Sequence, residues 1–304
     1  MTNKLAVSIA GLHLRNPTIL ASGVLGISGS TLRHAGDVGA GAVITKSLGL
    51  NHRTGYGNPT IVEVEGGLLN AMGLPNPGAE EFVNEIKIAK EGKVPVIASI
   101  FGSSLEEFAA VARIVEAGGA DAIELNLSCP HVGKVGLQLG QDPALVRDVV
   151  RRVKSAVEIP VIAKLSSNVS NIVDIASSAE RGGANAVTAI NTMRAMAIDV
   201  YVKKPILANA IGGLSGPAIK PVAMRCVYEI YESVKIPIIA AGGVKDWKDA
   251  VEFFLAGASA IQIGTAIKTY GLDVFSLVTS GIDRYMRDNG FKEVSEIVGE
   301  AHGS

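Results

Sequence analysis

The chain has 304 residues, of which 48% are hydrophobic and 19% charged, and 35 of them are glycines. This length suits one large α/β barrel or two ordinary domains. The formal net charge of −1 argues against a polyanion or a membrane surface as partner, and no basic run interleaved with aromatic residues indicates nucleic-acid binding. The amino terminus lacks a signal peptide's apolar core, and no apolar run reaches the roughly 20 residues of a membrane span. We therefore expect a cytoplasmic protein.

The predicted elements begin with residues 4–16, which alternate like a two-strand hairpin that closes the bottom of a barrel. Amphipathic helical segments then lie between most of a series of strand-like runs. These β-branched runs are 19–23, 42–48, 94–100, 122–129, 159–166, 186–192, 236–243 and 260–266. Their alternation predicts a (β/α)8 TIM barrel in one domain, residues 1–304. A doubly wound sheet is the alternative, but "GVLGISG" (23–29) matches a dinucleotide turn only loosely.

Two connections, residues 49–75 and 193–219, are too long for plain barrel loops. They follow the second and sixth predicted strands at their carboxyl ends, where barrel enzymes build their sites. We expect these segments to form a lid. A further extended loop, "HVGKVGLQLG", follows the fourth strand and has glycines that suit a mobile flap.

Polar residues occupy the ends of several predicted strands. In the fourth strand Glu124, Asn126 and Ser128 share one face, which we expect to point into the barrel. Cys129 follows at the rim, where Pro130 favours an extended residue before it. Other strand ends carry Lys46, Lys164, Asn191 and Thr192. Because a lysine among apolar neighbours is costly to bury alone, Lys46 and Lys164 indicate an anion or electron-rich group at the mouth. The alternative is that each pairs with a barrel carboxylate such as Glu124.

The last two predicted strands end in glycine-rich turns, "AAGGV" and "IGTA". Loops at this place in a barrel commonly bind phosphate through backbone N–H groups, which need the absence of side chains to approach the oxygens. Gly242, Gly243, Gly264 and Thr265 fit this pattern. Together with "GGLSGP" (212–217), they indicate a phosphate-bearing cofactor across the mouth.

The two cysteines, Cys129 and Cys226, lie far apart and neither belongs to a CxxC, so we expect no disulfide framework, metal site or four-cysteine iron–sulfur cluster. Cys226 lies in an amphipathic helical segment, which favours core packing. Cys129 has a chemical alternative, because a thiol with an ordinary pKa near 8.5 becomes a better base where lysines lower that value. A Cys–His nucleophile with His131 is also conceivable.

Several motifs together carry a resemblance over essentially the whole chain: "NAMGLPN", "NLSCPH", "KLSSNV", "AINT", "LANAIGGLSGPAIKP", "AAGGV" and "IGTA". In this order they resemble the catalytic subunit of class 1 dihydroorotate dehydrogenases. That resemblance implies an FMN-dependent (β/α)8 barrel that oxidises (S)-dihydroorotate to orotate in pyrimidine biosynthesis.

The resemblance also implies residue roles. Cys129 would be the base that removes the C5 proton while a hydride passes from C6 to the flavin. Lys164 would lie against the isoalloxazine and favour the anionic reduced form. The substrate would be held by Lys46, Asn70, Ala71, Met72, Gly73, Leu74, Asn126, Asn191 and Thr192. FMN would further contact Ser22, Lys46, Ser47, Asn126, Ile190, Gly216, Gly242, Gly243, Gly264 and Thr265.

The cysteine at position 129 resembles class 1, because the membrane-bound class has serine there. The segment "ANAIGGLSGPAIKP" resembles subclass 1B. This implies a partner subunit with FAD and a [2Fe–2S] cluster that passes electrons to NAD, in a heterotetramer built on a homodimer of this chain. The alternatives are a 1A-like homodimer using fumarate, a related barrel acting on another pyrimidine, and a flavin-free barrel that binds a phosphorylated metabolite. Two departures from the family pattern are His131, where asparagine is common, and Ser99, where a flavin-contacting asparagine often stands.

Overall fold

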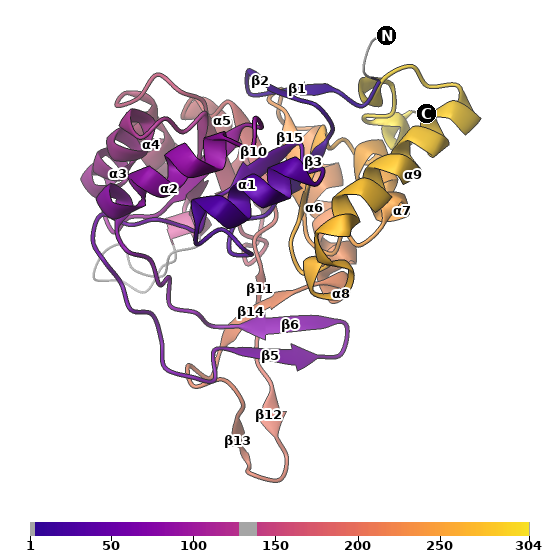
Figure 1. Ribbon diagram of the computed structural model, residues 1–304. Coiled ribbons are helices and arrows are strands. Elements are labelled where there is room, and N and C mark those ends of the chain that lie inside the picture. Colours follow the sequence, from indigo (N-terminus) through magenta and orange to yellow (C-terminus); the bar gives the residue numbers. More distant parts are fainter. Residues whose placement is uncertain (1–3, 128–138, 304) are drawn as a thin grey trace.

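A computed structural model describes residues 4–127 and 139–303 of the chain (Figure 1). Eight parallel strands close into a barrel in the order β10-β15-β16-β3-β4-β7-β8-β9. Each predicted run overlaps one barrel strand, which confirms the (β/α)8 barrel. In chain order the strands are β3 (Thr18–Leu20), β4 (Ala42–Ile44), β7 (Val96–Ile100), β8 (Ala122–Asn126), β9 (Val161–Leu165), β10 (Ala186–Ala189), β15 (Ile238–Ala241) and β16 (Ala260–Ile263).

Helices surround the barrel strands (Figure 1). The predicted caps are present: the Ser104 side chain accepts from the N–H of Glu107, and Asp142 accepts from two N–H groups beside Pro143. The helices are α1 (Gly29–Asp37), α2 (Ala79–Lys90), α3 (Leu105–Ala117), α4 (Pro143–Lys154), α5 (Ile172–Arg181), α6 (Lys220–Tyr231), α7 (Trp247–Leu255), α8 (Ile267–Tyr270) and α9 (Val274–Asn289). Short 3-10 turns cover Leu139–Gln141, Pro217–Ile219, Gly271–Asp273, Val294–Glu296 and Glu300–His302.

The amino-terminal segment forms an antiparallel hairpin of β1 (Val7–Ile9) and β2 (Leu12–Leu14). Its buried Ile9 and Leu14 join one apolar cluster with inward-facing residues of the barrel. Those partners are isoleucines and alanines of all eight barrel strands: Ile19, Ala42, Ile44, Ile97, Ala122, Ile162, Ala186, Ile239 and Ala260. The hairpin therefore closes the bottom of the barrel, as the sequence predicts.

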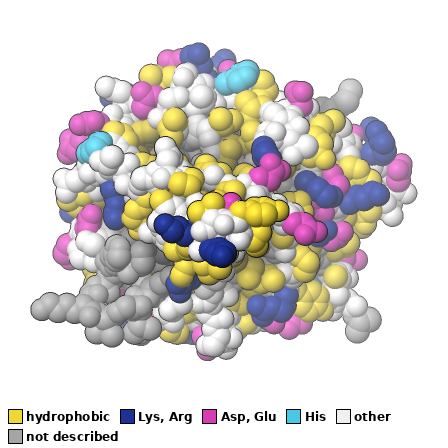
Figure 2. Space-filling model, turned by 90° about the horizontal axis from the view of Figure 1, so that it is seen from below, with side chains coloured by type: hydrophobic (Ala, Val, Ile, Leu, Met, Phe, Trp, Pro, Cys, Tyr) yellow, Lys and Arg dark blue, Asp and Glu magenta, His cyan; other side chains and the backbone are white. Residues whose placement is uncertain are grey.

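The two long connections fold together at the opposite end. β5 (Ile61–Val64), β6 (Gly67–Asn70), β11 (Met193–Ala195) and β14 (Gly212–Ser215) make one four-stranded sheet in the order β11-β14-β6-β5, which we call the lid sheet. The antiparallel hairpin of β12 (Ile198–Asp199) and β13 (Lys204–Pro205) projects beyond it (Figure 1). Figure 2 views the molecule from this side, where hydrophobic side chains gather around a few basic ones. Most of the predicted loop after β8 lies outside the described residues.

Candidate active site

A cavity of about 1060 Å³ lies between the carboxyl ends of the barrel strands and the lid sheet. Cys129 lies outside the described residues, as do Ser128, Pro130 and His131. Every other predicted site residue lines this cavity. They are Ser22, Lys46, Ser47, Asn70, Ala71, Met72, Gly73, Leu74, Asn126, Lys164, Ile190, Asn191, Thr192, Gly216, Gly242, Gly243, Gly264 and Thr265. The fold thus brings together residues that are far apart in the sequence.

The floor of the cavity is a buried polar network inside the barrel. Glu124 is fully buried, and its Oε1 lies 3.2 Å from the Nζ of Lys164. Thr188 Oγ1 and Gln262 Nε2 donate to the other carboxylate oxygen at 2.9 and 2.5 Å. Glu124 therefore points inward, as predicted from strand alternation. The alternative for Lys164, pairing with Glu124, is therefore present in the structure. Because Lys164 also lines the cavity, its contact with an electron-rich group stays a prediction.

Lys46 is in a different electrostatic position. It lies two residues beyond β4 and is half-buried on the cavity wall. No carboxylate of the described residues lies within ion-pair distance of it, and burial lowers the pKa of its ammonium below the ordinary value. An anion in the cavity would remove this penalty, so Lys46 keeps the anion-binding interpretation.

A chain of hydrogen bonds connects the polar residues above the floor. Ser99 and Ser47 share a hydrogen bond of 2.9 Å between their hydroxyl groups, and the amide of Asn126 donates to Ser47 Oγ at 3.1 Å. Asn191 in turn donates to Asn126 Oδ1 at 3.1 Å and accepts from the N–H of Thr192 at 2.8 Å. These contacts fix the orientation of both amides, so their polar edges are preorganised for a planar ligand with several donors and acceptors. Ser99 is nearly fully buried and acts through Ser47.

The glycine-rich end of the cavity requires glycine for steric reasons. Gly242 and Gly243 have φ values of +126° and +83°, in the left-handed region. A Cβ on Gly243 would lie 2.7 Å from the Cβ of Lys220. Among the described residues, no backbone carbonyl accepts from the N–H groups of Gly243 or Gly264. Two donors on the wall of a cavity are what a phosphate group needs.

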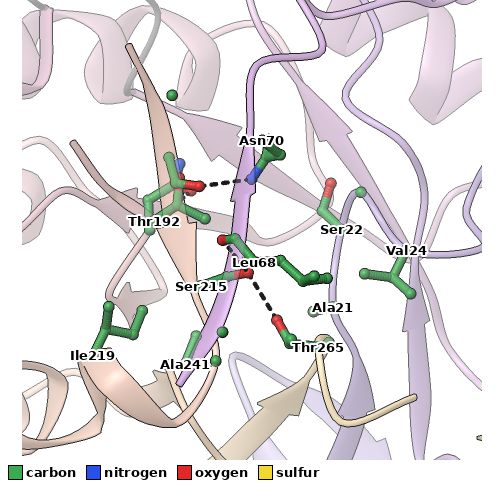
Figure 3. Close-up of a pocket in the computed structure, with 18 of the residues that line it drawn as sticks. Ala21, Ser22, Val24, Leu68, Asn70, Thr192, Ser215, Ile219, Ala241 and Thr265 are labelled. Carbon is green, nitrogen blue, oxygen red and sulfur yellow. Dashed lines mark hydrogen bonds between the residues drawn. The ribbon is translucent and has the colours of Figure 1, made fainter. Parts of the chain in front are cut away.

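One side-chain hydrogen bond joins the lid sheet to the barrel, and another joins two strands within the lid sheet (Figure 3). At the glycine-rich end Thr265 and Ser215 share a hydrogen bond of 2.8 Å between their hydroxyl groups. At the other end Asn70 donates to the carbonyl of Gly213 at 3.1 Å, which joins the two long connections. Asn76 orders the segment after β6, because its Oδ1 accepts from two backbone N–H groups and its Nδ2 donates to Leu74 O at 3.0 Å.

Sequence reasoning missed several residues of the cavity. Gln262 could have been predicted to point into the barrel, because it is a polar residue within the apolar run "AIQIG", as Glu124 is in its own strand. Arg53, Tyr56, Asn168 and Arg194 lie outside the barrel strands, where no periodicity marks them. No group of three or more metal-ligating side chains occurs in the described parts of the chain. No helix there has the length and apolar character needed to cross a membrane.

Fold and cavity together define a (β/α)8-barrel enzyme with a lidded polar site at the carboxyl ends of its strands. The family model for dihydroorotate dehydrogenase matches residues 4–286, and the chain belongs to this family. A relative from Pyrococcus horikoshii is 52% identical over 297 residues, covering 98% of this chain and 97% of the relative. One from Methanothermobacter thermautotrophicus is 53% identical over 300 residues, covering 98% of each chain. Both are named "Dihydroorotate dehydrogenase B (NAD(+)), catalytic subunit". The resemblance drawn from the motifs is thereby confirmed.

Proposed function

We propose that this chain oxidises (S)-dihydroorotate to orotate in de novo pyrimidine biosynthesis, with FMN as its bound cofactor and NAD as the final acceptor. The observation that carries the proposal is the cavity, which places two lysines, an ordered set of amides and a glycine-rich end within one site. Family membership and the names of the relatives support the same reaction.

The residues present fit FMN. The glycine-rich end offers backbone N–H groups without a backbone acceptor among the described residues, and Thr265 adds a hydroxyl there. Lys164 is 7% exposed and lines the cavity, so its ammonium can contact an electron-rich ring. We infer that Gly216, Gly242, Gly243, Gly264 and Thr265 hold the phosphate. Ser22, Ser47, Ile190 and Lys164 would hold the remainder of the cofactor.

Substrate binding is assigned to the opposite end of the cavity. Dihydroorotate is a carboxylate on a flat amide-containing ring, so it needs one cation and several directed donors and acceptors. Lys46 supplies the cation, and the pKa lowered by burial means that the ammonium gains most from an anionic partner. Asn126, Asn191 and Thr192 supply preorganised polar groups, and residues 70–74 form the lid side of this end.

The reaction breaks the C5–H and C6–H bonds of dihydroorotate and forms a double bond between these carbons. FMN, when bound, supplies the acceptor for the hydride from C6. We assign the C5 proton to Cys129, three residues after the end of β8, on the strength of the family motif "NLSCPH". A thiolate is a competent base near neutral pH once its pKa is moderately lowered.

Electrons would leave through a separate subunit. The "catalytic subunit" in the relatives' names implies such a partner, and we propose that it carries FAD and a [2Fe–2S] cluster, in a heterotetramer built on a homodimer of this chain. The projecting β12–β13 hairpin supports a protein partner, because its apolar side chains are unusually exposed, with Val200 at 73% and Tyr201 at 92%.

The test is the visible spectrum of the purified chain, followed by anaerobic addition of dihydroorotate. A flavin spectrum that bleaches on addition supports both cofactor and substrate. A flavin that stays oxidised would exclude dihydroorotate as substrate, and a colourless protein that takes up no FMN would overturn the proposal. Fumarate turnover by the isolated chain would instead favour the 1A-like homodimer.

A further inference from the structure

Glu124 occupies a position that substrate and cofactor binding do not explain. It is fully buried beneath the cavity, yet it contacts side chains from three other barrel strands. Lys164 lies on the neighbouring β9, and Thr188 on β10. Gln262 lies on β16, which is separated from β8 by three strands around the barrel. The carboxylate therefore holds a network that crosses the barrel interior directly below the cavity.

The hydrogen bonds in this network have fixed directions. Glu124 accepts at one oxygen from Lys164 and at the other from Thr188 and Gln262. Because the Gln262 amide donates to Glu124, its oxygen faces Lys164 and accepts from the ammonium at 2.8 Å. An ammonium has three N–H donors. Contacts among the described residues use two of them, which leaves one for a group in the cavity.

The charge of Lys164 depends on Glu124. The lysine is 7% exposed, and a buried ammonium is costly to keep charged without an anionic partner. Glu124 is the carboxylate of the described residues that forms an ion pair with Lys164. Gln262 contributes only a neutral oxygen, which orients the ammonium but offsets less of the desolvation.

We propose that Glu124 is a positioning residue that keeps Lys164 protonated in both redox states of the flavin, so that hydride transfer occurs beside a permanent cation. This inference rests on the proposed FMN site. In the balanced reaction, two electrons and one hydrogen reach the flavin as the C6 hydride, and the C5 proton goes to the base. Lys164 neither gains nor loses a proton.

The test is the midpoint potential of the bound FMN as a function of pH, measured by dye equilibration. In Glu124→Gln, the ammonium of Lys164 loses the carboxylate that pairs with it, so we expect Lys164 to take up a proton when reduction places negative charge on the flavin beside it. One extra proton per two electrons is a tenfold change in the equilibrium per pH unit, so the slope steepens by about 30 mV per pH unit. At the alkaline end of the titration the potential should approach that of Lys164→Met, which lacks the cation at every pH.

Thr188→Val is the matched control. It removes one hydrogen bond to the same carboxylate but keeps both charges, so its slope should equal that of the wild type. If Glu124 only held the surrounding side chains in place, Thr188→Val and Glu124→Gln should change the pH dependence of the midpoint potential in the same way. If the midpoint potential of Glu124→Gln changed with pH at the same slope as that of the wild type over the whole range, the proposal would be overturned.

A second measurement uses the unaltered protein and does not require Glu124→Gln to fold. The side-chain NMR signal of Lys164, assigned with Lys164→Met, should report a charged ammonium near neutral pH in both oxidised and reduced protein. A neutral amine in the oxidised form would overturn the proposal. Absence of FMN from the wild type would show that the proposed function itself has failed, and this inference with it; bound FMN with parallel slopes overturns the inference alone.

Discussion

The two cavity lysines should respond in opposite directions when their charges are removed. The perturbations are Lys46→Met and Lys164→Met, both measured on the FMN-free protein. Burial lowers the pKa of Lys46, and no described carboxylate forms an ion pair with it. Replacing it with methionine should therefore raise the free energy of unfolding by about 1 kcal/mol, the usual scale for relieving an unfavourable functional residue.

Lys164→Met should lower the free energy of unfolding by about 3 kcal/mol. It leaves the carboxylate of Glu124, which has no exposed surface, without its cation. Breaking a buried ion pair on one side costs about 3–5 kcal/mol. The hydrogen bonds from Thr188 and Gln262 remain and place the cost at the lower end of this range.

The assay is urea unfolding of the two variants and the wild type near neutral pH. The two variants should differ from each other by about 4 kcal/mol. A destabilised Lys46→Met, or a Lys164→Met variant as stable as the wild type, would refute the electrostatic reasoning. FMN retention is a separate readout, because loss of either lysine should weaken ligand binding whatever its effect on stability.

The pH dependence of the Lys46 effect has a defined sign. Folding lowers the pKa of this lysine below its ordinary value of 10.5, so the unfolded chain binds more protons between the lowered pKa and 10.5. The stability of the wild type relative to Lys46→Met should therefore rise with pH between the lowered pKa and 10.5. The greater free energy of unfolding of Lys46→Met should have its full size below the lowered pKa and should disappear as the pH approaches 10.5.

Two further substitutions test the chemistry and the cofactor site. Cys129→Ser should retain FMN but slow its anaerobic reduction by dihydroorotate by about 100-fold or more near neutral pH, because a hydroxyl is a far weaker base; stopped-flow absorbance measures this. Cys226→Ser is the control, since burial raises the pKa of that thiol to about 11. Gly243→Ala should weaken FMN binding at least tenfold by fluorescence titration, as an order-of-magnitude expectation. Gly11→Ala, at a similar φ of +84° but with no atom within 4 Å of the new Cβ, should leave FMN affinity unchanged.

Much of the fold follows from local sequence pattern. Buried parallel strands read as short β-branched runs, and the hairpin at residues 4–16 shows clear alternation. The lid sheet does not follow in the same way. Its central pairing joins β6 to β14, with Asn70 opposite Gly213. Length alone marked the two connections as unusual, and nothing local in either one specifies a partner so distant in the chain.

The site was predictable where polar residues interrupt apolar strands. Lys46, Glu124 and Lys164 stand out for this reason, and Gln262 could have been found by the same rule. Their pairing was not predictable, because it depends on which strands lie across the barrel from each other. Thr188 gave no signal, since threonine is common in strands. Its role appears only when its hydroxyl is seen to donate to Glu124.

The barrel interior changes character along its axis, and this explains why the two lysines differ. Below, isoleucines and alanines pack against the amino-terminal hairpin. Above them, one layer contains Glu124, Lys164, Thr188 and Gln262, all buried and hydrogen-bonded to one another. An apolar layer of similar volume would often be as stable or more so. Retention of the polar layer is understandable if the cavity above needs a cation held in one place. Under the proposed function, Lys46 instead meets its anionic partner in the substrate, which accounts for its having no ion pair with a described carboxylate.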